Sequence, residues 1–331
     1  MKDSLAFNLR RHLLVAAIAT SFGLTGVGVR AQDPSYPSKP ITIVVGFEAG
    51  GGSDAIARLV AQKLSDKLGQ QVIVVNKPGF GGNVAAEAAL KSPPDGYTLF
   101  LAAASYAVNP SLYKLSFDPV RDVTPIVQLT RGPFIVAVNP KVPAATLKDF
   151  VTLAKKEPGR YTYASSGKGG VVHIVSESFM ETADISVMHI PYRGTSPALA
   201  DTVAGYTQLI FGTVASTLPF VKSGQLKALA VTSSQRLKVL PDVPTVAEAG
   251  YPSFQAANWH GIVGPRGLPD DVVATLNKAV NAVLSAPAME ATLASEGLTA
   301  VGSTPAQFKA LLEAEIARWA RVARSRGIKL E

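Results

Sequence analysis

Short apolar runs alternate with helical patterns over most of the chain, from residue 41 to about residue 231. Runs rich in Val, Ile and Leu and bounded by Gly, Pro or Asn are typical of buried strands. The pattern predicts strands at 41–47, 72–76, 98–102, 134–139, 161–164, 187–190, 208–211 and 227–232. It predicts helices between them at 54–68, 83–91, 147–156, 171–181, 197–204 and 215–223. Such alternation indicates parallel strands with helices on both faces of each sheet.

Beyond Pro241 the pattern changes to helices, which are predicted at 269–285, 288–296 and 305–326. The last of these carries apolar residues three or four positions apart, the spacing of a helix with one buried face. This stripe comprises Phe308, Leu311, Leu312, Ile316 and Trp319. No repeat or low-complexity segment interrupts this order, and the length of 331 residues suits about two domains. The sequence therefore predicts a two-domain α/β protein.

Two positions are candidates for a passage between the domains. Asn139–Pro140 follows a predicted strand and precedes Thr146, which is expected to cap the next helix. The second position is near Thr232, where a strand leads into a proline-rich stretch. We therefore predict one lobe from 36–139 and 232–331, and a second lobe from 140–231. The two connecting strands would act as a hinge.

The N-terminal residues are expected to be a leader rather than part of the fold. Three basic residues near the start precede an apolar run over 13–28, and the small residue Ala31 ends the segment. This order is typical of a signal peptide, so residues 1–31 are predicted to be removed on export to the periplasm. Export by the general or the twin-arginine route stays open, because Arg10–Arg11 faintly resembles a twin-arginine signal. No later segment has the length for a transmembrane helix.

The charge and composition narrow the class of ligand. The formal net charge is +8, and the leader holds four basic residues against one acidic residue, so the mature chain carries +5. Basic residues are scattered without interleaved aromatic residues, which argues against nucleic-acid binding. A mild positive balance suits a small anionic ligand. The sequence has no cysteine, and its four histidines do not cluster with carboxylates at metal-ligand spacing, so no metal site is expected.

The most informative segment is the glycine-rich turn after the first predicted strand. Gly50, Gly51 and Gly52 lie between this strand and a helix that begins near Ser53 and Asp54. Such a turn presents free backbone N–H groups and the positive end of a helix dipole to an anion. It lacks the lysine of a phosphate-binding P-loop and the spacing of a dinucleotide fingerprint. Asp54 is expected to cap the helix or tie down the loop. A tight turn that binds nothing is the alternative interpretation.

Residues that directly follow the other predicted strands are further candidates, because ligands of open α/β sheets lie at the carboxyl ends of the strands. These residues are Ala104, Ser105, Ser165, Ser166, Gly167, Arg193, Gly194, Thr195, Gly212 and Thr213. Hydroxyls, glycines and helix starts that converge on one cleft would form a site for a carboxylate. Thr195 or Ser196 is expected to cap the helix that follows it.

Each feature also has an ordinary structural interpretation. The alternative for Ser165 and Ser166 is that they only satisfy the turn, and Arg193 is either a surface charge or part of an ion pair between domains. Lys168 is expected to be solvated. His173 is expected to be a packed, hydrogen-bonded histidine rather than a base, and His189 is interpreted in the same way.

Catalytic motifs do not occur in the sequence. It has no nucleophile elbow, no zinc-protease motif and no Cys-x-x-Cys pair. No candidate nucleophile has a base beside it. We therefore expect a binding protein with no catalytic residue and no cofactor.

Eight segments carry a resemblance to a known family. They are 36–41 (YPSKPI), 50–54 (GGGSD), 76–83 (NKPGFGGN), 94–97 (PDGY), 109–113 (NPSLY), 163–167 (YASSG), 190–194 (IPYRG) and 240–245 (LPDVPT). With these segments, in this order, the sequence resembles the Bug family from about Tyr36 to Glu331. This family comprises the periplasmic solute-binding receptors of tripartite tricarboxylate transporters.

The resemblance implies a two-lobed, Venus-flytrap fold of the type II periplasmic-binding class, each lobe a mixed, mainly parallel sheet flanked by helices. It implies a monomeric receptor without catalysis that delivers a small carboxylate to the large and small membrane subunits of a transporter. In the family, the first glycine loop holds the ligand carboxylate; that loop corresponds here to Phe47, Glu48, Gly51, Gly52 and Ser53 with the residues between them. The loop from Ser165 to Gly167 would hold the ligand from the second lobe, and Arg193 to Thr195 would close the site.

Two departures from the family pattern bear on the ligand. Residues 46–49 read GFEA, where the family usually has Pro-Phe-Pro-Pro. Glu48 therefore puts a carboxylate near the cleft mouth, which is expected to disfavour a second ligand carboxylate or to reach a ligand amine or hydroxyl. Many members have an aspartate where this chain has Gly212. Gly212 lacks the carboxylate that would contact a ligand ammonium group, and it is predicted to leave space for a bulkier ligand.

Two other functions stay open at this point. A ligand-sensing receptor of a two-component system, which presents its closed form to a histidine kinase, fits the same residues. A secreted α/β hydrolase would use Ser166 as its nucleophile and His173 as its base.

Overall fold

The computed structural model describes residues 36–328, and the expected leader lies outside them. The first elements are β1 (Ile41–Val45), α2 (Gly52–Leu68), β2 (Val72–Asn76), η1 (Phe80–Gly82), α3 (Asn83–Leu90), β3 (Thr98–Ala103), α4 (Ala104–Val108), η2 (Asn109–Ser111), β4 (Val123–Gly132), β5 (Phe134–Val138) and α5 (Leu147–Lys156). The remaining ones are β6 (Thr162–Ser165), α6 (Val171–Ala183), β7 (Met188–Pro191), α7 (Thr195–Ala204), β8 (Leu209–Thr213), α8 (Val214–Lys222), β9 (Lys227–Val231), β10 (Asn258–Pro265), α9 (Asp270–Leu284), α10 (Pro287–Ser295), β11 (Thr299–Ala300) and α11 (Pro305–Ser325).

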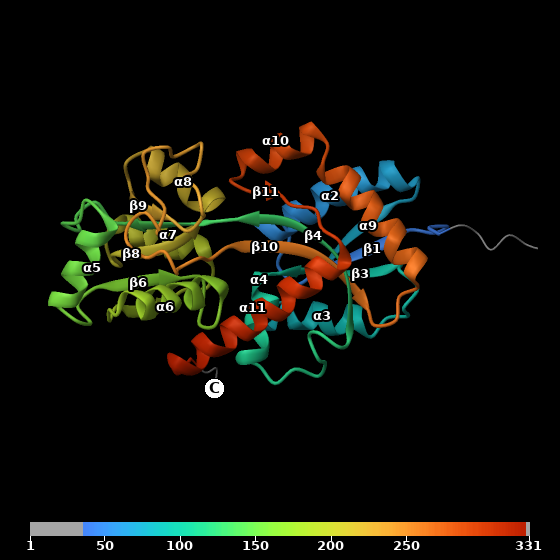
Figure 1. Cartoon of the computed structure of the whole chain (residues 1–331), viewed down its shortest axis with the longest axis horizontal. Helices are drawn as coiled ribbons and strands as arrows, with labels where there is room; N and C mark the ends of the chain where they lie inside the picture. The colour runs from blue at the N-terminus through green and yellow to red at the C-terminus, as the bar shows by residue number, and fades with distance from the viewer. Residues whose placement is uncertain (1–35, 329–331) are drawn as a thin grey trace, which may run out of the picture. The chain divides into compact units, whose positions relative to one another are not determined.

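These strands form two sheets, both of mixed direction (Figure 1). The first has six strands in the order β11-β4-β10-β3-β1-β2, and the second has five in the order β7-β6-β8-β5-β9. β1 pairs in parallel with β2 and β3, as the alternation predicts, and β6 pairs in parallel with β7 and β8. The antiparallel pairs all involve β4, β5 or β10. Two of these strands, β4 and β10, are absent from the sequence prediction.

Alternating side chains place each sheet between two layers of helices. In β1, Ile41, Ile43 and Val45 pack with α2 and α9 on one face, whereas Val44 belongs to the core shared with α3, α4 and α11. In β5, odd-numbered residues such as Ile135 face α7 and α8, and the even-numbered ones pack with α5 and α6. Because strand side chains point to alternate faces, both faces of each sheet are buried.

The chain passes between the sheets at Pro133, since β4 ends at Gly132 in the first sheet and β5 begins at Phe134 in the second. The first passage predicted at Asn139–Pro140 is therefore too late. The strand prediction was correct, but hydrophobic alternation does not reveal which sheet a strand joins. The return passage lies between β9, which ends at Val231, and β10, which begins at Asn258. The lobe boundaries themselves stay a prediction.

A buried threonine joins the two connecting segments. The Thr232 hydroxyl accepts a hydrogen bond from Phe134 N–H at 2.8 Å and donates one to the Ala256 carbonyl at 2.6 Å. The backbone N–H of Thr232 also donates to the Phe134 carbonyl. The hydroxyl and amide of Thr232 and the amide and carbonyl of Phe134 therefore all have protein partners, which suits a defined hinge rather than a loose linker.

Helix α11 links the two sheets through an ion pair just beyond its end. Arg326 Nε donates to Glu177 Oε2 on α6 at 2.7 Å, and Tyr163 on β6 donates to Glu177 Oε1 at 2.6 Å. Only 11% of the Glu177 side chain and 30% of the Arg326 side chain are exposed. Partial burial makes this pair stronger than a surface ion pair, because water screens it less.

We therefore expect Arg326→Ala to lower the free energy of unfolding by about 1–2 kcal/mol. Urea unfolding measures this change. The matched control is Arg160→Ala, which removes an exposed ion pair with Glu157 and should cost less than about 0.5 kcal/mol. Equal losses in the two variants would show that α11 does not depend on the Glu177 contact.

Candidate functional site

The glycine loop after β1 is fixed from behind by Asp54. Asp54 is 3% exposed, and its carboxylate accepts hydrogen bonds from Gly50 N–H (2.8 Å), Arg58 Nε (2.9 Å) and Asn76 Nδ2 (2.9 Å). The Arg58 hydrogen bond, together with those from Gly50 and Asn76, lowers the pKa of Asp54 to about 2. The prediction that Asp54 ties down the loop is confirmed. Since α2 begins after Gly51 without a side-chain cap, its first amides remain available to an anion.

A second glycine segment, Gly79–Gly82, packs directly on the first loop. A Cβ on Gly46 would lie 2.5 Å from Gly82 Cα, so the two backbones touch and Gly46 does not accept a side chain without a shift. Gly82 has a φ of 96°, which disfavours a side chain there. Ser105 Oγ, at the start of α4, donates to the Gly81 carbonyl at 3.3 Å. This segment was not among the predicted site residues, although its Gly-Phe-Gly-Gly run lies between a strand and a helix.

His260 connects the start of α2 to the centre of the first sheet. Its Nε2 lies 3.1 Å from Ser53 Oγ, and its Nδ1 lies 3.0 Å from Thr130 Oγ1. His260 is 3% exposed and pairs in register with Ala103, the last residue of β3. Ser53 is thereby held beside the β3–α4 turn, which carries Ala104 and Ser105. His260 was not among the predicted site residues.

Acidification is expected to destabilise the protein through His260. Burial lowers the pKa of His260 from 6.5 to about 4. The unfolded chain then binds the proton at a higher pH than the folded chain, so stability is complete above about pH 6.5 and declines as the pH falls towards 4. This group should remove roughly 2 kcal/mol of unfolding free energy between pH 7 and pH 5. Urea unfolding at both pH values should show a smaller acid loss in His260→Gln. An equal loss would contradict the assignment.

The second sheet holds two candidate loops that are joined to each other. Tyr192 N–H donates to the Ser165 carbonyl at 3.0 Å, and Gly194 N–H donates to the Ser166 carbonyl at 3.2 Å. Helix α6 begins after Gly170, and α7 begins after Gly194, both without a side-chain cap. The expected capping by Thr195 or Ser196 is therefore wrong. The N-cap residue is Gly194, whose φ of 110° suits glycine, and the helix starts at Thr195, two residues before the predicted 197.

The candidate residues differ in their exposure. Five of them are exposed: Glu48, Gly51, Gly52, Lys168 and Arg193. Eight others are half-buried: Phe47, Ser53, Ser105, Ser166, Gly167, Gly194, Thr195 and Thr213. Ala104 and Ser165 are fully buried, and Ser165 Oγ is already used by Gly167 and His189 within the second loop. Ser165 therefore supports the loop through its side chain. Arg193 forms no ion pair with any of the described residues.

The space predicted beside Gly212 is occupied. A Cβ on Gly212 would lie 1.8 Å from Thr217 Oγ1, and Thr217 is fully buried in α8. The prediction that Gly212 leaves room for a bulkier ligand is therefore wrong, because a hydroxyl from the following helix fills that volume. Thr213, the next residue, places its Oγ1 2.8 Å from Ser216 Oγ.

The two sets of loops approach each other where the sheets meet. Helix α4, which begins at Ala104, packs against α6, which follows the second-sheet loop. Val214 on α8 touches Gly297, which lies just before β11 of the first sheet. A Cβ on Gly297 would lie 2.2 Å from Val214 Cγ1. The elements that carry both sets of candidates are thus in contact through their helices.

The helix starts at the candidate loops share one property. Helices α2, α4, α6, α7 and α8 have no side-chain cap, whereas α5 and α11, which begin elsewhere, have complete capping boxes. Thr146 caps α5, as predicted. Since α3, α9 and α10 also lack side-chain caps, this property is compatible with anion binding but does not by itself define a site.

The described residues offer little support for metal or acyl-transfer chemistry. No group of three His, Asp or Glu side chains among residues 36–328 is arranged to hold a metal ion. His173 Nδ1 accepts a hydrogen bond from Gly169 N–H at 3.0 Å. Among residues 36–328, no hydrogen bond joins the Ser166 hydroxyl to His173. The Ser166–His173 pair of the hydrolase hypothesis is thus not formed. No described helix is both long and apolar enough to span a bilayer.

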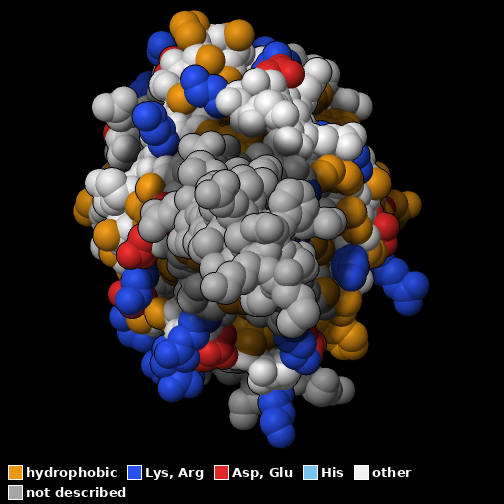
Figure 2. All heavy atoms as spheres, turned by 90° about the vertical axis from the view of Figure 1, so that its right-hand side faces the viewer, with side chains coloured by type: hydrophobic (Ala, Val, Ile, Leu, Met, Phe, Trp, Pro, Cys, Tyr) orange, Lys and Arg blue, Asp and Glu red, His pale blue; other side chains and the backbone are white. Residues whose placement is uncertain are grey.

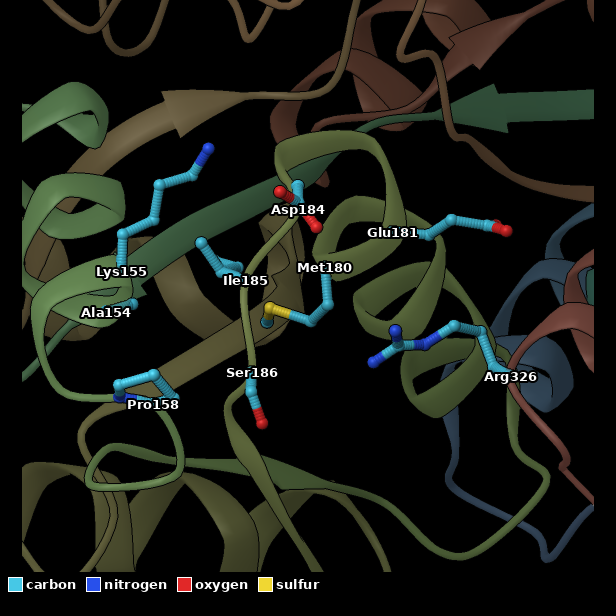
Figure 3. Close-up of a pocket in the computed structure, with 9 residues that line it drawn as sticks. All are labelled: Ala154, Lys155, Pro158, Met180, Glu181, Asp184, Ile185, Ser186 and Arg326. Carbon is cyan, nitrogen blue, oxygen red and sulfur yellow. The ribbon is translucent and has the colours of Figure 1, made fainter.

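A cavity of about 550 Å³ lies away from all these loops, between α5, α6 and Arg326 (Figure 3). Its lining mixes Lys155 and Arg326 with Glu181 and Asp184, so it offers no net charge preference. On the face shown in Figure 2, Lys and Arg side chains are spread among apolar, acidic and neutral ones. This distribution agrees with the scattered basic residues of the sequence and does not suggest a polyanion-binding surface there.

The family model, the relatives and the solved structures that are similar to this chain agree with one another. Residues 56–328 match the family described as "Tripartite tricarboxylate transporter family receptor". Protein BugT of Bordetella pertussis is 34% identical over 321 residues, which cover 96% of this chain and 98% of BugT. The R. palustris protein Rpa4515, solved with adipate, is 33% identical with a TM-score of 0.80, and 89% of this chain and 100% of that one are covered.

Two other solved structures are similar over comparable lengths. The periplasmic binding protein BugD has 31% identity and a TM-score of 0.77, with 89% of this chain and 100% of that one covered. MatC from Rhodopseudomonas palustris, solved with malate, has 31% identity and a TM-score of 0.76, with coverages of 87% and 99%. These likenesses show that the chain has the two-lobed fold of periplasmic binding proteins, as the sequence resemblance implied.

Proposed function

The chain belongs to the tripartite tricarboxylate transporter receptor family, and from this membership we propose that it captures a small organic carboxylate between its two lobes. The observation that carries the proposal is the similarity, over nearly the whole chain, to proteins solved with the dicarboxylates adipate and malate. Members of this family are periplasmic binding proteins, and BugD is one of them.

The ligand would be held by backbone amides rather than by a permanent cationic side chain. The uncapped first turn of α2 would bind a carboxylate from one lobe, and the loop from Ser165 to Gly167 with the start of α6 would bind it from the other. Arg193, which is exposed and free of ion pairs among residues 36–328, would add a positive charge when the lobes close. Glu48, also exposed, would favour ligands with an amine or hydroxyl near that end.

We propose further that the protein acts without catalysis and without a cofactor. The receptor would be exported through its N-terminal leader, work as a monomer in the periplasm and deliver its ligand to the large and small membrane subunits of a transporter. Contacts made only in the closed state would drive closure about the segments at Pro133 and Thr232. Presentation of the closed form to a histidine kinase is the remaining alternative, and a pull-down from membranes would separate the two.

Isothermal titration calorimetry of the mature protein with malate, adipate, citrate, glutamate and benzoate tests this function. At least one acid should bind with a dissociation constant on the order of micromolar, which corresponds to about 8 kcal/mol. Native mass spectrometry of freshly purified protein would weigh any acid that co-purifies. Silence across all aliphatic and aromatic acids would reject the carboxylate class.

A further inference from the structure

Three aromatic rings lie behind the ligand loop of the second sheet. His189 on β7 is the register partner of Tyr163 on β6, and their ring centroids are 4.9 Å apart with planes 18° from parallel. His173, in the first turn of α6, stacks on His189 at 3.9 Å and 11°, and its ring centroid lies 6.4 Å from that of Tyr163. His173 is 5% exposed, and His189 is half-buried. The two imidazoles thus form a stacked pair packed between the sheet and α6.

Both imidazoles make polar contacts into the loop from Ser165 to Gly170. Gly169 N–H donates to His173 Nδ1 at 3.0 Å. A backbone N–H can only donate, so this nitrogen carries no proton, and the neutral ring holds its proton on Nε2. His189 Nε2 lies 2.6 Å from Ser165 Oγ, and this hydroxyl accepts a hydrogen bond from Gly167 N–H at 3.2 Å. Each ring therefore fixes a different point of the same loop.

The loop depends on these contacts because its own backbone is unusual. Gly167 and Gly169 adopt φ values of 144° and 78°, which other residues rarely adopt. Gly170 then begins α6 with no side-chain cap. The contacts from His173 and His189 hold this turn together with the Gly170 N–H bond to the Gly167 carbonyl, the Ser165 hydroxyl, and the N–H groups of Tyr192 and Gly194.

We propose that His173 and His189 are positioning residues for anion capture, and that the loop binds its anion only while both imidazoles are neutral. The inference rests on the proposed function, since it assigns the support behind one of the two ligand loops. Protonation of His173 would set an Nδ1–H against the Gly169 N–H and break that hydrogen bond. It would also bring a positive charge within stacking distance of His189.

The surroundings of the pair favour the neutral state. Burial, reinforced by Lys168, lowers the pKa of His173 to about 4. Burial lowers the pKa of His189 to about 4 as well. His173 and Lys168 add to this lowering, whereas Glu177 opposes it. The charged and titratable groups around the pair are Lys168 in the loop, Glu177 on α6 and Tyr163 on β6. Because Glu177 is already paired with Arg326, it is not free to neutralise a protonated histidine.

The test uses adipate as the probe and compares four full-length mature proteins by calorimetry from pH 7.5 to pH 4.5. In His173→Asn the amide oxygen takes the place of Nδ1 and cannot be protonated, whereas His173→Leu removes the acceptor. Tyr163→Phe is the matched control, since it changes the same stack and removes the bond to Glu177 without touching the loop. Adipate itself titrates at about pH 4–5, so the ratio of affinities between variant and wild type is the quantity compared at each pH.

We expect His173→Leu to bind adipate at least tenfold more weakly than wild type at pH 7. Because a pKa of about 4 leaves only about a quarter of His173 protonated at pH 4.5, the wild type should lose about 1.3-fold relative to His173→Asn between pH 7.5 and pH 4.5, and Tyr163→Phe should follow the wild type. A constant ratio of wild type to His173→Asn, or unimpaired binding by His173→Leu at pH 7, would overturn the proposal.

Nitrogen-15 NMR of the ring and of the Gly169 amide gives an independent readout. It should show an unprotonated Nδ1 on His173 at pH 7 and a Gly169 shift that follows the histidine titration. If adipate and the other acids fail to bind the wild type at any pH, the proposed function falls. The NMR result then decides the positioning role alone, and a protonated Nδ1 at neutral pH would reject it.

Discussion

Gly212→Ala is expected to lower the free energy of unfolding by about 3 kcal/mol, and Thr217→Ala in the same chain is expected to restore most of it. The added Cβ would lie 1.8 Å from Thr217 Oγ1 but 3.1 Å from Thr217 Cβ, so removal of the hydroxyl and methyl relieves the overlap. Gly212 lies in β8 and is paired with Ile135 of β5, and Thr217 is fully buried. Neither side can move away without breaking the sheet or the core.

A double-mutant cycle by urea unfolding measures this coupling. Thr217→Ala alone should cost only about 1 kcal/mol, since its hydroxyl makes one long contact, 3.4 Å from Ser216 Oγ. Gly52→Ala is a control for glycine replacement as such, because a Cβ there meets nothing within 4 Å. A Gly212→Ala variant as stable as the wild type would mean that Thr217 does not occupy this space.

The cycle also bears on ligand selection. From the sequence, Gly212 was predicted to replace an aspartate and thereby to add volume for the ligand. In the structure the glycine is the counterpart of Thr217, so an aspartate at this position would need a smaller residue on α8. The difference from the family at Gly212 is thus matched by the packing of Thr217 on α8, rather than being a direct change in the ligand site.

The elements with strong local patterns could be predicted from the sequence. Strand β2 (Val72–Asn76) and helix α5 (Leu147–Lys156) have the bounds that their apolar spacing indicates. Strands β4 and β10 were missed because both contain glycine, proline and buried polar residues, among them Thr130 and His260. In β10, a Cβ on Gly261 would lie 2.2 Å from the Phe308 ring of α11, so that glycine is required by a helix that comes later in the chain.

The candidate loops could be located, but the residues that support them could not. Loops at the carboxyl ends of strands follow from the order of elements alone. The contact between Ser53 and His260 joins residues separated by 207 positions, and the packing of Gly46 on Gly82 joins two separate turns. Such pairs depend on sheet order and register, which a single sequence does not encode locally. Histidines 173 and 189 were correctly interpreted as packed and hydrogen-bonded, but their partner groups became known only from the fold.

Gly51→Val is expected to weaken carboxylate binding at least a hundredfold while the fold stays intact. Gly51 is the residue before α2 and has φ −79° and ψ 168°, a conformation that valine adopts readily. A Cβ there meets only the Glu48 carbonyl oxygen, at 3.3 Å, so the folded chain can accept it with a small shift. The two γ-carbons would then cover the exposed start of α2, whose amides are proposed to face the ligand. A hundredfold loss corresponds to about 2.7 kcal/mol, roughly a third of a micromolar affinity.

Calorimetry with the tightest acid from the screen measures the loss, and urea unfolding shows whether the fold survives. Gly159→Val is the matched control, because Gly159 lies in a half-buried turn between α5 and β6 with open space around a Cβ. Its φ of 77° makes valine strained there, so this variant should lose stability and retain affinity, the reverse of Gly51→Val. Because strain and site blockage then act on different measurements, unchanged affinity in Gly51→Val would remove the α2 amides from the site without placing the fold in question.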